Sequence, residues 1–278
     1  MTICMAAIGA DVTGREGSAV VVASDRMVTM ANLIEFEHTV PKALGIGGRA
    51  VALIAGDSLI GSHLVKEVAA SVAAGPITVA QLAQDLSAKY AETRNNHAEA
   101  DILAPRGLTW AAFYGQHQNL VAQLTMMLDS QLNNYDLRVE LLIAGVDDGG
   151  GHIFAVTNPG TRPQDHDVIG YAAVGSGGLH ALQSMIGFRH AVSASVQETI
   201  FRVYASKRRA EVAPGVGHET DMFVVQSTGT TTIPQATLEE LSTLFDEFST
   251  STQQDLEARL STIPFSQPRK ESRRRHAK

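Results

Sequence analysis

The sequence is poor in cysteine and in basic charge. Its 278 residues include one cysteine, Cys4, which cannot form an intrachain disulfide or a cysteine-rich metal site and fits a reducing compartment. Lysine and arginine together number 22 against 29 aspartates and glutamates, so the formal net charge is -7. This balance argues against a general affinity for nucleic acids or for anionic membrane surfaces.

The sequence also has no segment typical of export or of a membrane span. No basic residue precedes Asp11, which ends the first apolar stretch too early for a signal peptide. Two windows without formal charge, 107–128 and 168–188, contain polar side chains or several glycines that a lipid-spanning helix disfavours. We therefore expect a cytoplasmic protein.

No pattern indicates a metal ion or a cofactor. The ten histidines are scattered, and no pair has the helical spacing and acidic partner of a zinc site. The glycine-rich segment 145–151 lacks the Lys-Ser/Thr pair of a phosphate-binding loop. The glycines before the helix expected at 178 could cradle an anion, but close backbone packing explains them too. We expect neither a cofactor nor a metal.

The 44% of apolar residues suffices to bury a core, and periodicity divides the chain into strands and helices. Short apolar or β-branched runs predict strands at 2–8, 18–24, 42–46, 50–55, 139–145, 152–157 and 221–226. Helical spacing predicts helices at 59–73, from 78, from 178, at 195–209 and at 237–248. Residues 119–132 fit a helix or a strand. This order favours stacked sheets with helices outside.

Thr2 is the first candidate for chemistry. If the initiator Met1 is removed in the cell, Thr2 combines a hydroxyl nucleophile with a free α-amine, which titrates near pH ~8 and is partly neutral at pH 7. One residue then supplies both nucleophile and base. Many proteins begin with Met-Thr for no catalytic reason, so position alone does not decide.

Asp25 and Lys42 are candidates for an electropositive niche. Asp25 ends the strand expected at 18–24, and Lys42 opens a later one. A carboxylate that keeps a buried lysine charged lowers the cost of forming an alkoxide nearby. The alternative is an exposed ion pair, which contributes roughly 0–1 kcal/mol to stability.

Several short motifs resemble those of the proteasome β-subunits. They occur in the family's order and at similar distances over most of residues 2–248. The motifs are Thr2, Ala23–Arg26, Val28–Met30, Lys42, Ala52–Asp57, Leu141–Asp147 and Ala173–Gly178. The Thr-x-Cys start and the Ala-Ser-Asp-Arg box also resemble the Anbu branch of bacterial proteasome-like proteins.

The resemblance implies an N-terminal nucleophile (Ntn) hydrolase of the α+β class. Its fold would be a four-layer αββα sandwich, with two stacked, mainly antiparallel sheets flanked by helices. One domain is expected over residues 2–249, with an insertion at about 93–135. Residues 250–278 are expected to form a polar, basic and disordered tail. Activation is expected to need removal of Met1, not autolytic cleavage of a propeptide.

The resemblance also implies roles for individual residues. Thr2 would be the nucleophile and its own amine the base, acting through a water molecule. Lys42 would favour deprotonation of the nucleophile, and Asp25 would hold the ammonium in place. Ser176 lies where the family keeps a serine near the threonine amine, and Glu211 lies approximately where the family has a supporting aspartate.

Three features depart from the family pattern. The oxyanion donor is expected to be the backbone amide of Leu53, where the family usually has glycine, and the leucine side chain could narrow the substrate cleft. Pro214 replaces the serine that follows the supporting residue and offers neither a hydroxyl nor an amide N–H. The insertion 93–135 could be a lid, an assembly contact or a substrate wall, and its aromatic residues at 110–114 are expected to pack as core.

We therefore expect a threonine-type endopeptidase that hydrolyses peptide or unfolded-protein substrates through an acyl-enzyme ester. The resemblance implies a homo-oligomer, either a ring or a helical array, and leaves room for an ATP-dependent unfoldase as a partner. Two alternatives stay open. One is a catalytically inactive structural or regulatory subunit of the same fold. The other is an Ntn amidase or acyl-transferase that acts on small amides.

Overall fold

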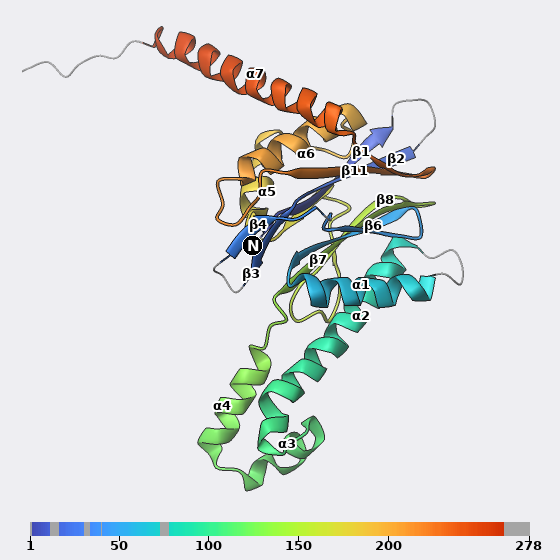
Figure 1. Cartoon of the computed structure of the whole chain (residues 1–278), viewed down its shortest axis with the longest axis vertical. Coiled ribbons are helices and arrows are strands. Elements are labelled where there is room, and N and C mark those ends of the chain that lie inside the picture. Colours follow the sequence, from blue (N-terminus) through green and yellow to red (C-terminus); the bar gives the residue numbers. More distant parts are fainter. Residues whose placement is uncertain (1, 12–16, 31–33, 40, 73–77, 264–278) are drawn as a thin grey trace, which may run out of the picture. The chain divides into compact units, whose positions relative to one another are not determined.

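The computed structural model describes residues 2–11, 17–30, 34–39, 41–72 and 78–263 (Figure 1). They form a mixed α+β structure with several antiparallel sheets. The chain divides into two compact units, residues 1–235 and 236–278. None of the described helices combines the length and the apolar composition that crossing a bilayer requires.

The first sheet carries the N-terminal strand as one of its inner strands. Its strands, in spatial order, are β10 (Tyr171–Val174), β1 (Cys4–Asp11), β2 (Gly17–Asp25), β11 (Thr220–Gln226) and β12 (Gly229–Thr232). All neighbouring pairs are antiparallel. Ala19 to Ala23 in β2 are fully buried, which explains why this run is apolar at consecutive positions. The strands predicted at 2–8, 18–24 and 221–226 are thus confirmed.

The second sheet is a meander of five antiparallel strands. They are β5 (Ala43–Ile46), β6 (Ala50–Gly56), β7 (Val139–Asp147), β8 (Gly150–Val156) and β9 (Gln164–Asp165). The β5–β6 hairpin turns at Gly47 and Gly48, whose φ angles of 62° and 80° suit a tight hairpin turn. A small separate sheet pairs β3 (Met27–Met30) with β4 (Ile34–Glu37), which the sequence did not predict.

The two five-stranded sheets share an apolar core. It includes Cys4 and Val22 from the first sheet and Leu53 and Leu142 from the second. On its other face, the second sheet packs against α1 (Ser58–Val72) and α2 (Val79–Ala98). The helices α5 (Gly178–Gly187) and α6 (Val196–Ala210) contact β10, β1 and β2 of the first sheet (Figure 1).

The segment 93–135 is helical and has a small core of its own. Beyond the end of α2 it contains η1 (Glu99–Leu103), η2 (Ala104–Arg106), α3 (Trp110–Gln116), η3 (His117–Asn119) and α4 (Ala122–Asn133). Residues 119–132, which fitted either state, are therefore mainly helical. Phe113 is buried in this core and Trp110 packs against it, as expected, whereas Tyr114 is half exposed and stacks on Trp110.

Arg94 of α2 fastens the base of this insertion. Its side chain is buried and donates to the carbonyl oxygens of Leu132 and Asn133 at the end of α4, at 2.9 and 3.1 Å. It also donates to the carbonyl oxygen of Tyr135 and to the side chain of Asn158, both at 3.0 Å. The guanidinium thus supplies donors to carbonyl groups in the last turn of α4 and just beyond it.

The second unit contains α7 (Gln235–Leu260) except for its first residue. The sequence predicted a helix that ends at Phe248, followed by a disordered tail, and this was wrong for residues 250–260. No glycine or proline occurs between Gln235 and Pro264, and an Asp255–Arg259 pair at 3.0 Å supports the added turns. The rest of the expected tail, residues 264–278, lies outside the described residues.

Candidate active site

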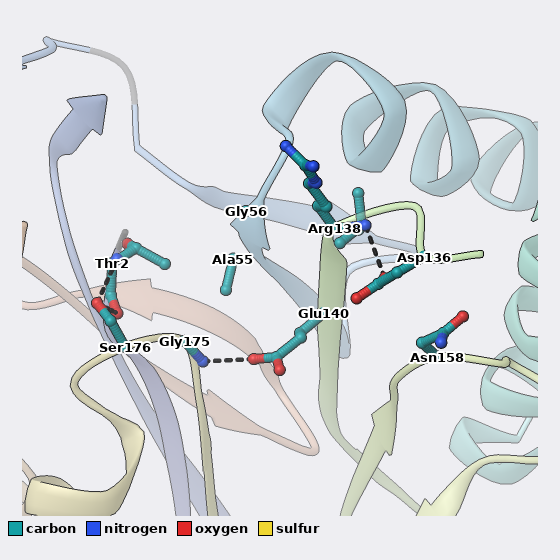
Figure 2. Close-up of a pocket in the computed structure, with 10 residues that line it drawn as sticks. Thr2, Ala55, Gly56, Asp136, Arg138, Glu140, Asn158, Gly175 and Ser176 are labelled. Carbon is teal, nitrogen blue, oxygen red and sulfur yellow. Dashed lines mark hydrogen bonds between the residues drawn. The ribbon is translucent and has the colours of Figure 1, made fainter. Parts of the chain in front are cut away.

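Thr2 lies two residues before the start of β1 and is buried. The loop that follows β10 holds its backbone: the N–H of Gly177 donates to the carbonyl oxygen of Thr2 at 3.2 Å. The nitrogen of Thr2 donates to Oγ of Ser176 at 3.1 Å (Figure 2). Ser176 Oγ also lies 3.3 Å from the carbonyl oxygens of Thr2 and Pro214, to either of which it can donate.

Asp25 and Lys42 both reach the hydroxyl of Thr2. The Thr2 hydroxyl donates to Asp25 Oδ1, and the Lys42 ammonium donates to Thr2 Oγ1. Lys42 Nζ and Asp25 Oδ1 are 2.8 Å apart, with side-chain exposures of 13% and 0%. This is not the exposed ion pair that the sequence left as an alternative. Asp25 and Lys42 follow Thr2 by 23 and 40 positions in the chain. They meet it because β1 and β2 pair antiparallel and Lys42 directly precedes β5.

Backbone N–H groups hold the Asp25 carboxylate in place. Ile3 N donates to Oδ1 at 3.1 Å, while Met27 N and Gly217 N donate to Oδ2 at 3.3 and 2.9 Å. Both carboxylate oxygens therefore have partners in a fully buried position. Such a carboxylate has a fixed orientation, which in turn fixes the direction in which Lys42 points.

Cys4 is near this group but is not a competing nucleophile. Burial raises the pKa of its thiol to about 12, although the Lys42 charge opposes that shift. The thiol donates to the carbonyl oxygen of Ile54 at 3.4 Å. Because the thiolate is the reactive form of cysteine, a thiol with this pKa is inert at neutral pH.

Thr2 opens into a cleft of about 400 Å³, which we call the Thr2 cleft. The end of β6 and the loop after β10 contribute to its lining, and the start of β7 contributes charged groups (Figure 2). The lining residues are Thr2, Ala55, Gly56, Asp136, Arg138, Val139, Glu140, Asn158, Gly175 and Ser176. Glu140 Oε2 accepts a hydrogen bond from Gly175 N at 2.6 Å, which ties β7 to the loop that carries Ser176.

The expected oxyanion donor, the amide of Leu53, is not at this cleft. Leu53 lies within β6, and its side chain is fully buried between the sheets. Ile54 N donates to the carbonyl oxygen of Lys42 at 3.1 Å, and N–H groups alternate along a strand between its two neighbours. The Leu53 N–H therefore faces β7 and not the cleft, which contradicts its assignment as the oxyanion donor.

Gly56 is the last residue of β6 and carries a backbone N–H at the wall of the cleft. It lines the Thr2 cleft, and its N–H lies on the same side of β6 as that of Ile54, towards Lys42. Its φ of 94° is a left-handed conformation, and a Cβ there would lie 2.0 Å from the carbonyl oxygen of Arg138. A glycine is thus required at this point of the cleft wall.

Glu211 is not among the contacts of Thr2. It follows α6, and its carboxylate turns back along the helix to Lys207 at 2.7 Å and to His218 at 2.9 Å. Its supporting role, which the resemblance implies, stays a prediction, and the partners of its carboxylate are Lys207 and His218 and not Thr2. Pro214, whose ring removes an N–H, still reaches the site because its carbonyl oxygen lies 3.3 Å from Ser176 Oγ.

Two residues near the site escaped the sequence reasoning. Lys207 belongs to a Lys-Arg-Arg run that looks like a solvated helix end, yet its side chain is fully buried. Gly217 contacts Asp25, but its position in a glycine-rich loop gave no sign of this. The sequence does contain one signal for Lys207: Glu211 follows it by four residues, which is the spacing of an ion pair on a helix.

Comparisons with known proteins do not identify this arrangement. No protein-family model matches the chain, and no curated protein sequence matches it significantly. Over the part of the chain that the structure describes, no group of three or more histidine, cysteine, aspartate or glutamate side chains is arranged to hold a metal ion. The interpretation of the site therefore depends on its own geometry.

Proposed function

We propose that this chain is a threonine-type peptidase with the four-layer αββα architecture of Ntn hydrolases, as its resemblance to proteasome β-subunits implies. One observation carries the proposal: the hydroxyl of a buried Thr2 contacts both the Lys42 ammonium and the Asp25 carboxylate, at the wall of a cleft. The packing of helices on the outer faces of two stacked sheets supports the architecture.

The proposed reaction begins after removal of Met1. The Thr2 nitrogen, now a free amine that keeps its place near Ser176 Oγ, takes the proton of the Thr2 hydroxyl through a water molecule. Oγ1 attacks the carbonyl carbon of the substrate. The Lys42 ammonium stabilises the negative charge that develops on Oγ1, and Asp25 keeps that ammonium in position.

The tetrahedral intermediate then needs a hydrogen-bond donor to stabilise its negatively charged oxygen. The Gly56 N–H is the backbone group of the Thr2 cleft that faces the Lys42 side. Collapse of the intermediate breaks the carbon–nitrogen bond, and the α-ammonium of Thr2 protonates the departing amine. The neutral amine then accepts a proton from a water molecule as that water attacks the Thr2 ester, and it passes this proton to Oγ1 as the ester bond breaks, which releases the acid and restores the hydroxyl and the free amine.

Two details of the site weaken the alternative of an inactive subunit. Leu53 had suggested a narrowed substrate cleft, but the Thr2 cleft is lined by Gly56 and not by Leu53. Pro214 had suggested a lost supporting contact, but its carbonyl oxygen remains within reach of Ser176. Assembly into a homo-oligomer and cooperation with an unfoldase stay predictions from the resemblance.

Intact mass spectrometry tests the proposal. The purified protein should lack the mass of Met1 and should gain the mass of one β-lactone probe, attached to Thr2. Thr2→Ala should abolish both the labelling and the cleavage of fluorogenic peptides, whereas Thr2→Ser should retain both because it keeps the hydroxyl. A mature Thr2 terminus with neither labelling nor turnover would favour the inactive subunit. Turnover of small amides in place of peptides would favour an amidase.

A further inference from the structure

Lys207 is a fully buried ammonium whose three donors are all used. Its Nζ lies 2.7 Å from Glu211 Oε1, 2.9 Å from the carbonyl oxygen of Gly217 and 2.7 Å from that of His218. An ammonium has three N–H donors, so this set satisfies it. Burial lowers the pKa of Lys207, and the nearby Glu211 and Asp25 carboxylates oppose that shift. A buried charge of this kind is costly unless each donor has a partner.

The peptide groups of Gly217 link Lys207 to Asp25. The Gly217 carbonyl oxygen accepts from Lys207, while the Gly217 N–H donates to Asp25 Oδ2 at 2.9 Å. Glu37 Oε1 accepts from the next two N–H groups, those of His218 and Glu219, at 2.6 and 3.0 Å. The loop is therefore held from the α6 side by Lys207 and from the β4 side by Glu37.

Close packing leaves the Gly217 peptide little freedom. A Cβ at Gly217 would lie 2.6 Å from Glu37 Oε1, 3.1 Å from Met27 Cβ and 3.2 Å from Met27 N. Met27 N is itself a donor to Asp25. The loop thus packs on the segment that follows the carboxylate, and any displacement of the loop alters the donors of Asp25.

From these contacts we infer that Lys207 is a positioning residue, which acts through the Gly217 peptide to hold Asp25, and thereby Lys42 and Thr2, in the geometry for attack. The inference rests on the proposed function, because it assigns Lys207 to the reaction of Thr2. Lys207 does not line the Thr2 cleft, so its influence is on the chemical step and not on substrate binding.

The test compares Lys207→Met with a matched control, Arg202→Met. Both substitutions remove a positive charge that pairs with a glutamate four residues away along the chain, but the Arg202–Glu198 pair is partly exposed and 3.6 Å long. For Lys207→Met, kcat for a fluorogenic peptide should fall by about 10²-fold, the effect of a small misplacement at a reacting centre. KM should be unchanged, because the substitution does not alter contacts that bind the substrate equally in the ground state and the transition state. The control should match the wild type in both constants.

Hydrogen exchange reports on the same contact without any turnover. In the full-length protein, exchange of the Gly217 amide, followed by mass spectrometry, should be at least about tenfold faster in Lys207→Met, because the hydrogen bond to a charged acceptor is weakened. Exchange in Arg202→Met should equal that of the wild type. Unchanged exchange in Lys207→Met, or equal losses of kcat in the two variants, would overturn the inference.

A second variant covers the case in which Lys207→Met does not fold. Gly217→Ala leaves Lys207 and Glu211 intact but pushes the peptide away from Met27 and Asp25. It should reproduce the loss of kcat at constant KM, and wild-type kcat in this variant contradicts the inference. If the wild-type protein neither reacts with a β-lactone nor cleaves peptides, the proposed function fails instead, and the exchange comparison still decides whether Lys207 orders the loop.

Discussion

Replacing Lys42 with methionine is the most direct perturbation of the electrostatics at Thr2. Lys42 Nζ lies 2.8 Å from Asp25 Oδ1, and with an effective dielectric constant of about 20 two unit charges at that distance attract by roughly 6 kcal/mol. Most of this attraction is cancelled by the free energy that it costs to remove the two charged groups from water. What the substitution leaves behind is a fully buried carboxylate that has lost its counter-charge.

Removing one partner of a buried ion pair typically costs about 3–5 kcal/mol of stability. Asp25 keeps its hydrogen bonds from the backbone of Ile3, Met27 and Gly217, so we expect a value near the lower end, about 3 kcal/mol. The effect on reactivity should be separate. Loss of a group that stabilises a developing oxyanion lowers the rate by about 10²–10³-fold.

Two assays separate these effects. Urea denaturation measures the loss of stability, and the single-turnover rate of β-lactone attachment to Thr2 measures reactivity at a temperature where the variant is fully folded. Lys89→Met is the control, because Lys89 pairs with Glu67 and Glu92 at an exposed site, and it should change neither quantity. A Lys42→Met variant that is destabilised but labels at the wild-type rate would refute the role of Lys42 in activating the nucleophile.

Two further predictions concern the cleft wall and the second sheet. Gly56→Ala should cost about 1–3 kcal/mol in urea denaturation, because alanine is strained in this backbone conformation and its Cβ would meet the Arg138 carbonyl oxygen; wild-type stability contradicts this. Burial opposes charging of His152, but Asp167 and Asp147 outweigh it and raise the His152 pKa above its ordinary value of 6.5. The resulting stability is complete below the unfolded-state pKa and is lost as the pH rises through the higher folded-state pKa. Denaturation measured from about pH 5 to pH 9 should show this slope, and it should be absent in His152→Gln.

Local chemistry explains why much of the fold was predictable from the sequence. The Gly47-Gly48 pair permits the turn that joins β5 to β6, and this turn sets their register without help from distant residues. Thr78 caps α2, with its hydroxyl accepting from Gln81 N at 3.2 Å. Such signals lie within a few residues of the element they control, so a reader of the sequence can find them.

The errors arose where tertiary contacts decide. The choice between Leu53 and Gly56 depends on which side of β6 each N–H faces, and only the pairing of β5, β6 and β7 determines that. The burial of the Lys207 ammonium was not predicted because it depends on two carbonyl groups from a loop ten residues away. The full length of α7 was missed because its surface is polar on most sides, which resembles a tail in composition.

The side chain of Arg94 links the insertion to the Thr2 cleft. One planar group joins the last turn of α4, the chain that leads into β7, and Asn158 in the Thr2 cleft. An ammonium has neither the flat shape nor the spread of donors to span these acceptors, so lysine is no substitute at this position. Arg94 therefore holds both the base of the insertion and one edge of the Thr2 cleft, and neither can be redesigned without regard to the other.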